Sequence, residues 1–229
     1  MDVIILTGGM GTRLKSKIKD IPKTMASWNG VPFLERTINW LNKFEIQNVI
    51  LAVGYKKEII KNYFGNQYKN INIIYSEEET PLGTGGAIKQ ALEKTNQEKV
   101  IVMNGDILAR VDLNSMYKKH LDSNATMTIA IKHMENFDRF GVIKFNENRI
   151  TEFLEKRYVE SGYMNTGVYI MNKKIFDNKI NDKVFSLEND YLNKYVSEDQ
   201  IVPFIYDGNF IDIGIPEDYE KLQEIVDEL

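Results

Sequence analysis

The first half of the chain alternates short runs that are apolar on both faces with segments whose apolar residues recur at helical spacing. The apolar runs cover 2–6, 49–54, 71–75 and 99–106, and the helical segments run from Pro32 to about Phe44, over 55–64 and over 84–94. Strands without a polar face are typical of a parallel sheet covered by helices on both sides. The pattern therefore predicts an α/β fold with a doubly wound sheet, and ligands are expected at the carboxyl ends of its strands.

The second half has shorter and more closely spaced strand-like runs. These runs cover 126–132, 140–146, 149–155, 162–171 and 201–206, with a turn at 146–148. Helices are expected near 113–122, after Ser186 as a cap, and from Pro216, where one face carries Tyr219, Leu222, Ile225, Val226 and Leu229. We expect a smaller mixed sheet laid over the first half. No repeat or linker divides the chain, so 1–229 is interpreted as a single domain.

Composition narrows the range of functions. The chain has 229 residues, of which 43% are hydrophobic and 27% charged, and no apolar stretch approaches the roughly 20 residues that cross a bilayer. We therefore expect no membrane partner, no signal peptide and a cytoplasmic protein. Cysteine is absent and only His120 and His133 are histidines, which argues against disulfides, thiolate nucleophiles and a zinc site. The net charge of −4 and the scattered lysines argue against a nucleic-acid partner.

The segment LTGGMGTRL at 6–14 follows the first predicted strand directly. Its glycines Gly8, Gly9 and Gly11 leave consecutive backbone N–H groups open to an anion, and Arg13 adds a planar cation suited to phosphate oxygens. The segment lacks the GK[ST] ending of a P-loop, and Leu14 stands where a dinucleotide fingerprint has its third glycine. Taken alone, it could equally be a tight strand-to-helix turn with a surface arginine.

Further motifs give this segment a context. LTGGMGTRL followed by PKTM at 22–25 resembles the signature of the sugar-phosphate nucleotidyltransferases, and the other motifs of that family follow in order: PLGTGGAI at 81–88, NGD at 104–106, FGVI at 140–143, EK at 155–156, NTGVY at 165–169 and DIGIP at 212–216. The resemblance implies a Rossmann-like, mostly parallel sheet with a small mixed-sheet lobe that binds the sugar. Residues 1–110 would then be mainly the nucleotide-binding half, and 111–229 mainly the sugar-phosphate-binding half.

Within this family, GTGGAI with FLEKRY and a short C-terminus is most similar to the heptose 1-phosphate guanylyltransferases. That resemblance implies transfer of a nucleotidyl group from GTP to D-glycero-α-D-manno-heptose 1-phosphate, with release of pyrophosphate, to make GDP-heptose for cell-surface polysaccharides. Other substrate pairs stay open, namely mannose 1-phosphate with GTP and glucose 1-phosphate with UTP or dTTP. A dinucleotide-dependent oxidoreductase and a nucleotide sensor without catalysis are the alternatives from other classes. A homodimer is left open.

The resemblance assigns residues to three groups. The expected catalytic residues are Arg13, Lys23, Asp106 and Asp212, of which the two aspartates would hold Mg²⁺. The expected nucleotide contacts are Leu6, Gly8, Gly9, Gly11, Thr12, Arg13, Glu78, Gly83 and Thr84. The expected sugar-phosphate contacts are Gly141, Glu155, Lys156, Asn165 and Gly167.

Two departures from the family pattern concern these residues. Thr24 replaces the usual second proline after Lys23, and Arg157 replaces a proline after Lys156. Taken singly, each assigned residue also has a simpler interpretation: a turn or cap for either aspartate, a surface cation for Lys23, and an exposed ion pair for Glu155 and Lys156.

The base is interpreted from the acidic run Glu77, Glu78 and Glu79, which directly precedes PLGTGG. A carboxylate can accept from both the N1–H and the N2 amino group of guanine, whereas uracil and thymine match an amide better. Guanine is therefore favoured. The sequence leaves open which of the three glutamates faces the base, and such a run is also typical of a solvated loop.

Overall fold

The computed structural model describes residues 1–9, 20–154 and 156–224 of the chain. The apolar runs of the first half form the parallel centre of a large sheet, in the spatial order β7-β1-β4-β6. These strands are β1 (Asp2–Leu6), β4 (Asn48–Val53), β6 (Ile71–Glu77) and β7 (Lys99–Asn104). The α/β class and the mostly parallel sheet that the sequence predicts are thereby confirmed.

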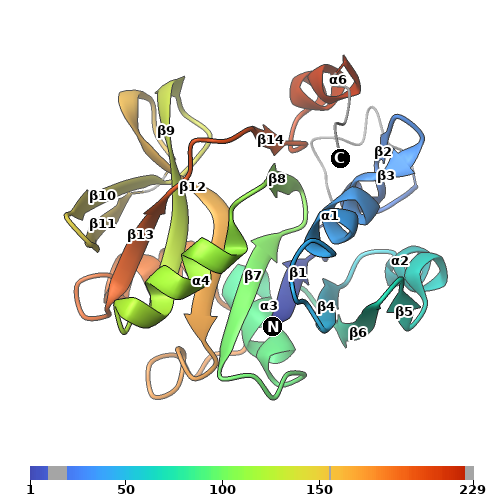
Figure 1. Cartoon of the computed structure of the whole chain (residues 1–229), viewed down its shortest axis with the longest axis horizontal. Coiled ribbons are helices and arrows are strands. Elements are labelled where there is room, and N and C mark those ends of the chain that lie inside the picture. The colour runs from blue at the N-terminus through green and yellow to red at the C-terminus, as the bar shows by residue number, and fades with distance from the viewer. Residues whose placement is uncertain (10–19, 155, 225–229) are drawn as a thin grey trace.

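Helices cover both faces of this parallel centre (Figure 1). Successive residues of β1 point to opposite faces: Val3 and Ile5 pack with α1, α2 and α4, whereas Ile4 packs with α3. The bounds are α1 (Phe33–Leu41), α2 (Lys57–Phe64), α3 (Gly83–Leu92) and α4 (Leu113–Asp122). Burial on both faces explains why these strands have no polar side in the sequence.

The second half continues the same sheet. The segment Val168–Asn172 of β12 (Val159–Asn172) pairs antiparallel with β7, and β12 also pairs with β9 (Met127–Phe137) and β10 (Val142–Asn146). Beyond these lie β11 (Arg149–Leu154), paired with β10, and β13 (Ile201–Ile205), parallel to β9. The strands of the second half thus form the expected mixed part of the sheet, but the expectation that they lie over the first half as a separate sheet is wrong. Pairing with β7 satisfies backbone groups that would otherwise form an open sheet edge.

Short elements complete the fold. They are the hairpin β2 (Ser27–Trp28) and β3 (Val31–Pro32), β5 (Gln67–Tyr68) beside β6, the pair β8 (Ile107–Ala109) and β14 (Phe210–Asp212), the 3₁₀ helix η2 (Lys23–Met25), the π-helix η3 (Leu187–Leu192), α5 (Asn193–Tyr195) and α6 (Pro216–Glu224). Ser186 caps η3 as predicted, because its Oγ accepts from the backbone N–H of Asn189 at 3.2 Å.

The last predicted helix also forms, and Leu222 is buried against Trp28, Phe33 and Ile213. Ile225, Val226 and Leu229, expected on the same face, lie outside the described residues. None of the helices in the described ranges combines the length and the apolar character that a bilayer crossing demands.

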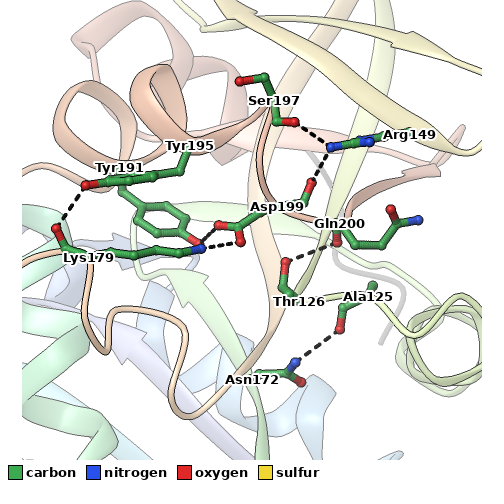
Figure 2. Close-up of polar contacts among 10 residues, drawn as sticks. All are labelled: Ala125, Thr126, Arg149, Asn172, Lys179, Tyr191, Tyr195, Ser197, Asp199 and Gln200. Carbon is green, nitrogen blue, oxygen red and sulfur yellow. Dashed lines mark hydrogen bonds and ion pairs between the residues drawn. The ribbon is translucent and has the colours of Figure 1, made fainter.

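A buried ionic network anchors η3 to the second half of the sheet (Figure 2). The Asp199 carboxylate pairs with Lys179 Nζ and accepts from the Tyr191 hydroxyl, while the Asp199 backbone carbonyl accepts from Arg149 of β11 at 3.3 Å. Lys179 Nζ also lies over the rings of Tyr191 and Tyr195, at 5.7 and 5.4 Å from their centroids. We call Lys179, Tyr191, Tyr195 and Asp199 the Asp199 network; its polar groups find their partners within the chain.

Candidate active site

Two cavities open at the carboxyl ends of the parallel strands and share part of their walls. The first cavity has a volume of about 320 Å³ and lies at β1, β6 and the start of α3, and the second has about 500 Å³ and lies toward β10, β12 and η3. Both are lined by Lys23, Thr84, Asn104 and Asp106. Their position is the one that the doubly wound pattern predicts.

The first cavity contains the described part of the predicted nucleotide set. Leu6, Gly8, Gly9, Glu78, Gly83 and Thr84 all line it. Gly11, Thr12 and Arg13, which were also assigned to the nucleotide, lie outside the described residues. The expected residues from three separate segments are thus brought together around one hollow.

Glu78 approaches the glycine segment closely. A Cβ built on Gly8 would lie 2.6 Å from Glu78 Oε1, so a side chain at this position would collide with the carboxylate. The other oxygen, Oε2, accepts from the Leu82 backbone N–H at 3.0 Å. Burial raises the pKa of Glu78, and the bond from Leu82 opposes that shift. Glu78 therefore has one hydrogen-bonded oxygen and one at the cavity wall beside Gly8.

The structure distinguishes the three glutamates of the acidic run. Glu77 forms ion pairs with Lys57 at 2.7 Å and Lys61 at 2.9 Å, and these cations lower its pKa to about 2. Glu79 is exposed. Of the three, only Glu78 lines the first cavity, because successive side chains at the end of β6 point in different directions.

A cation and two carboxylates meet where the cavities join. Lys23, on η2, donates from Nζ to Asp106 Oδ2 at 2.6 Å. The pKa of Asp212 is raised, first by burial and second by the negative charge of Asp106, while the positive charge of Lys23 opposes the shift. The two carboxylates are therefore near enough to interact, although they lie 106 positions apart in the numbering.

Their meeting follows from the pairing of two short strands. Asp212 ends β14 and faces Ile107 of β8, and the Ile213 N–H donates to the Asp106 carbonyl at 3.0 Å. Asp106 comes directly after Gly105, where a Cβ would lie 2.5 Å from the Leu6 carbonyl oxygen. The chain must therefore turn on a glycine there, and the turn places Asp106 beside Lys23.

The donor chemistry here fits a magnesium ion. Mg²⁺ is commonly held by one or two carboxylates together with substrate phosphates, and Asp106 and Asp212 supply such a pair beside a cavity. The described residues contain no group of three or more histidine, cysteine, aspartate or glutamate side chains arranged to hold a metal. A site completed by phosphate oxygens therefore fits better than a cage made entirely of protein ligands.

The second cavity contains four of the five residues expected for the sugar phosphate. Gly141, Lys156, Asn165 and Gly167 line it, and Glu155 lies outside the described residues. Asn165 is held at both ends of its amide: Nδ2 donates to the Tyr169 hydroxyl at 2.7 Å, and Oδ1 accepts from the Gly167 N–H at 2.9 Å. The amide is therefore fixed before any ligand binds.

Gly167 is required at its position for two reasons. Its φ is +74°, a conformation that side chains rarely adopt, and a Cβ there would lie 2.6 Å from Asn104 Nδ2. Because Asn104 lines both cavities, Gly167 lets β12 approach the residue at their junction.

The sequence-based assignment omitted several residues that line these cavities. They include Thr7, Thr24, Pro81, Ala87 and Asn104 in the first cavity, and Ile107, Arg139, Phe140, Phe153, Ser186, Glu188 and Asn189 in the second. Asn104 could have been found as the first residue of NGD, and Arg139 and Phe140 adjoin or belong to FGVI. No sequence signal pointed to Glu188 or Asn189, which arrive on the π-helix η3.

Two residues of the cavity walls carry buried polar atoms without a hydrogen-bond partner in the described part of the chain. They are Thr24, through Oγ1, and Arg139, through Nη1. Thr24 is the residue that replaces the family's second proline. Unpaired buried polar atoms are uncommon in folded proteins, so their place at a cavity is informative.

Comparison with known proteins agrees with this geometry. The family model described as nucleotidyl transferase matches residues 2–228. D-glycero-alpha-D-manno-heptose 1-phosphate guanylyltransferase from Aneurinibacillus thermoaerophilus is 47% identical over 98% of this chain and 97% of its own length. The enzyme of the same name from Campylobacter jejuni is 43% identical over 96% of this chain and 97% of its own length.

A solved structure extends the likeness to three dimensions. HddC from Yersinia pseudotuberculosis, complexed with GMP-PN, has a TM-score of 0.86 and 37% identity, with 97% of this chain and 98% of that chain covered. The chain therefore belongs to the nucleotidyl transferase family, and the resemblance identified in the sequence is confirmed.

Proposed function

We propose that this protein is a heptose 1-phosphate guanylyltransferase. It transfers the guanylyl group of GTP to D-glycero-α-D-manno-heptose 1-phosphate and forms GDP-heptose and pyrophosphate. The observation that carries the proposal is the junction of two cavities at Lys23 and Asp106, because two phosphorylated substrates must meet at a cation and a carboxylate. The full-length relatives with this activity in their names support the choice of base and sugar.

The first cavity would hold GTP. Leu6, Gly8, Gly9, Gly83 and Thr84 would line its base, ribose and phosphates, and the family motif gives Gly11, Thr12 and Arg13 the rest of the triphosphate. Glu78 would accept from guanine N1–H and N2, because its Oε1 lies at the wall beside Gly8 while Leu82 fixes Oε2. Donors from guanine favour the charged carboxylate and would offset the cost of its burial.

The second cavity would hold the sugar 1-phosphate. Lys156 would pair with its phosphate, and Asn165, with Glu155, would contact sugar hydroxyls. Gly141 and Gly167 would allow the backbone to approach the sugar; a Cβ on Gly141 would lie 2.5 Å from the Phe153 ring. The sugar would then lie on the opposite side of Lys23 and Asp106 from the nucleotide.

Asp106 and Asp212 would hold Mg²⁺, which when bound would neutralise the charge that shifts between the phosphates. In the reaction, a phosphate oxygen of the sugar 1-phosphate attacks the α-phosphorus of GTP, and the bond from that phosphorus to the β-phosphate oxygen breaks. Lys23 is placed to donate to the α-phosphate oxygens throughout this in-line exchange. Arg13 is assigned to the departing pyrophosphate from its place in the motif. We expect the protein to act in the cytoplasm.

Pyrophosphate release tests this proposal. The purified protein is incubated with Mg²⁺, one of GTP, ATP, CTP, UTP or dTTP, and one of heptose, mannose or glucose 1-phosphate. We expect the largest kcat/KM for GTP with heptose 1-phosphate. Turnover confined to UTP or dTTP would contradict the role of Glu78, and the absence of pyrophosphate from every pair would contradict the transferase activity itself.

A further inference from the structure

Arg139 differs from the other cations of the second cavity in how it is held. It lies in the turn between β9 and β10, and its Nη2 donates to the Asp218 carboxylate of α6, with which it forms an ion pair. Its guanidinium carbon also lies 5.3 Å from the centre of the Phe140 ring. One edge of the guanidinium is thus fixed by a carboxylate, and one face is packed on an aromatic ring.

The remaining terminal nitrogen of Arg139, Nη1, has no hydrogen-bond partner among the described residues. Nη1 is buried, and nothing in the described residues accepts from it. A buried donor without an acceptor costs free energy, and a ligand that supplies an acceptor at the cavity would remove that cost. Arg139 lines the second cavity, together with Lys156 and Asp212.

The turn that carries Arg139 packs directly on the strand that carries Asp212. Phe140 meets Phe210 of β14 edge to face, with ring centroids 5.2 Å apart, and both belong to one apolar cluster. The charge of Arg139 also lowers the pKa of Asp212, against the larger effects of burial and Asp106. Arg139 therefore lies at the second cavity and near Asp212, and the nucleophilic phosphate must lie there if the proposed function is right.

From this geometry we propose that Arg139 binds the phosphate of the sugar 1-phosphate through Nη1, and that Asp218 is a positioning residue that orients its guanidinium. The proposal rests on the proposed function and adds a substrate-binding residue to it. A phosphate oxygen is favoured over a sugar hydroxyl as the acceptor, because a charged acceptor forms the stronger bond with a partly desolvated guanidinium. Lys156 then contributes a second, more exposed cation to the same phosphate.

Steady-state kinetics of Arg139→Gln, Arg139→Lys and Asp218→Asn test the proposal, with pyrophosphate release measured at varied sugar 1-phosphate and at varied GTP. Loss of one charge-assisted bond predicts a KM for the sugar 1-phosphate that is raised on the order of tenfold or more in Arg139→Gln. The KM for GTP should stay within about twofold, because Arg139 does not line the first cavity. Arg139→Lys keeps the charge without the planar fork, so an intermediate value is expected, and Asp218→Asn should give the smallest rise.

Inorganic phosphate separates this role from a structural one. As a competitive inhibitor against the sugar 1-phosphate, it should lose affinity in Arg139→Gln by a factor similar to the change in KM. Lys144→Gln is the matched control, since Lys144 is an exposed cation of β10 whose partner is Glu152 at 2.9 Å. Its kinetics should equal those of the wild type.

Three results would overturn the proposal: unchanged kinetics in Arg139→Gln, equal rises in the two KM values, or unchanged inhibition by phosphate. If Arg139→Gln does not fold, as judged by circular dichroism, Arg139→Lys decides by the same criteria. If the wild type releases no pyrophosphate from any substrate pair, the proposed function fails. In that case, calorimetric titration of inorganic phosphate into wild type and Arg139→Gln tests whether Arg139 binds phosphate. Weaker binding in the variant would support its role, and equal affinities would refute it.

Discussion

Two groups of charged residues in this protein are built in opposite ways. In the Asp199 network, the carboxylate is only 7% exposed, and it contacts a lysine and a tyrosine hydroxyl from the same half of the chain. At the junction of the cavities, Asp106 is 36% exposed, one of its oxygens faces Lys23, and its charge disfavours the ionised form of the neighbouring Asp212. The first group satisfies its charges internally, and the second leaves two carboxylates close together.

The difference shows which group is arranged for a ligand. Placing two carboxylates near each other costs free energy in the free protein unless a cation or proton arrives. The Asp199 network has no such deficit, and its tyrosine rings pack on the lysine. Paired charges here maintain η3, whereas the two neighbouring carboxylates at the cavities fit the proposed role of binding a metal together with substrate phosphates.

Breaking the Asp199 network should have the largest effect on stability. Asp199→Ala leaves the partly buried Lys179 without its carboxylate and the buried Tyr191 hydroxyl without its acceptor, which together are expected to lower the free energy of unfolding by about 2–4 kcal/mol in urea titrations. Well below the unfolding temperature, kcat/KM should fall far less than in Asp212→Asn, because Asp199 lines neither cavity and acts on the second only through η3, which carries Glu188 and Asn189.

Asp122→Ala is the control for that variant. Asp122 pairs with Lys118 at 2.6 Å on an exposed helix face, so its loss should cost less than about 1 kcal/mol. A similar small loss in Asp199→Ala would contradict the structural role assigned to the network.

Breaking the carboxylate pair should affect activity instead. We expect Asp212→Asn to lower kcat on the order of a hundredfold or more, the scale for loss of one electrostatic stabiliser, with no loss of stability. The control is Asp207→Asn, an exposed aspartate that lines neither cavity. Near-normal turnover in Asp212→Asn would remove this residue from the mechanism.

Glu78, at the first cavity, tests whether a carboxylate beside a cavity is arranged for a ligand. Glu78→Gln replaces one carboxylate oxygen by a donor, so the hydrogen bonds to guanine are mismatched and kcat/KM for GTP should fall roughly tenfold to a hundredfold. The control is Glu79→Gln, whose kcat/KM for GTP should equal that of the wild type because Glu79 is exposed. If Glu79→Gln has the larger effect on selectivity between GTP and UTP, the assignment of Glu78 is wrong.

The smallest expected effect is a pH dependence of stability with opposite signs at two carboxylates. The folded-state pKa of Asp212 is raised above 3.8, so the folded protein holds this proton to higher pH than the unfolded chain. Its contribution to stability therefore decreases as pH rises through the interval from 3.8 to the raised pKa. In urea titrations with chelator, the stability of Asp212→Asn relative to wild type should be greater at pH 7 than at pH 3.5.

Glu77 should show the reverse. Lys57 and Lys61 lower its pKa to about 2, so its contribution is fully present above pH 4.5 and is lost as pH falls toward 2. Relative to wild type, Glu77→Gln should therefore be less stable at pH 7 than at pH 3.5. If the stability relative to wild type changed in the same direction between pH 3.5 and pH 7 in both variants, the difference between the ion-paired Glu77 and the buried Asp212 would be contradicted.

Much of the fold could be predicted from the sequence. The central strands are recognisable because burial on both faces requires apolar residues. Gly105 after β7 is recognisable because the close approach of β1 leaves no room for a Cβ. The predicted site residues also lie together: all of those in the described ranges line one or both cavities. These predictions depend only on the residue types and spacing within short segments of the sequence.

Other features required three-dimensional information. The acidic run has three residues of the same type, and only the direction of each side chain at the end of β6 distinguishes Glu78 from its neighbours. Likewise, the sequence does not show that β12 would extend the central sheet, since strand pairing depends on which edge remains open.

By itself, the sequence determined the α/β class and the family, because each depends on the type and spacing of residues that are near one another in the chain. The tertiary structure alone decided which glutamate of the acidic run lines the first cavity and how Asp106 comes to lie near Asp212. It alone also shows that, within the described residues, Nη1 of Arg139 has no acceptor at the second cavity. The physical reason is that local propensity acts over a few residues, whereas burial, hydrogen-bond satisfaction and charge proximity depend on segments far apart in the chain.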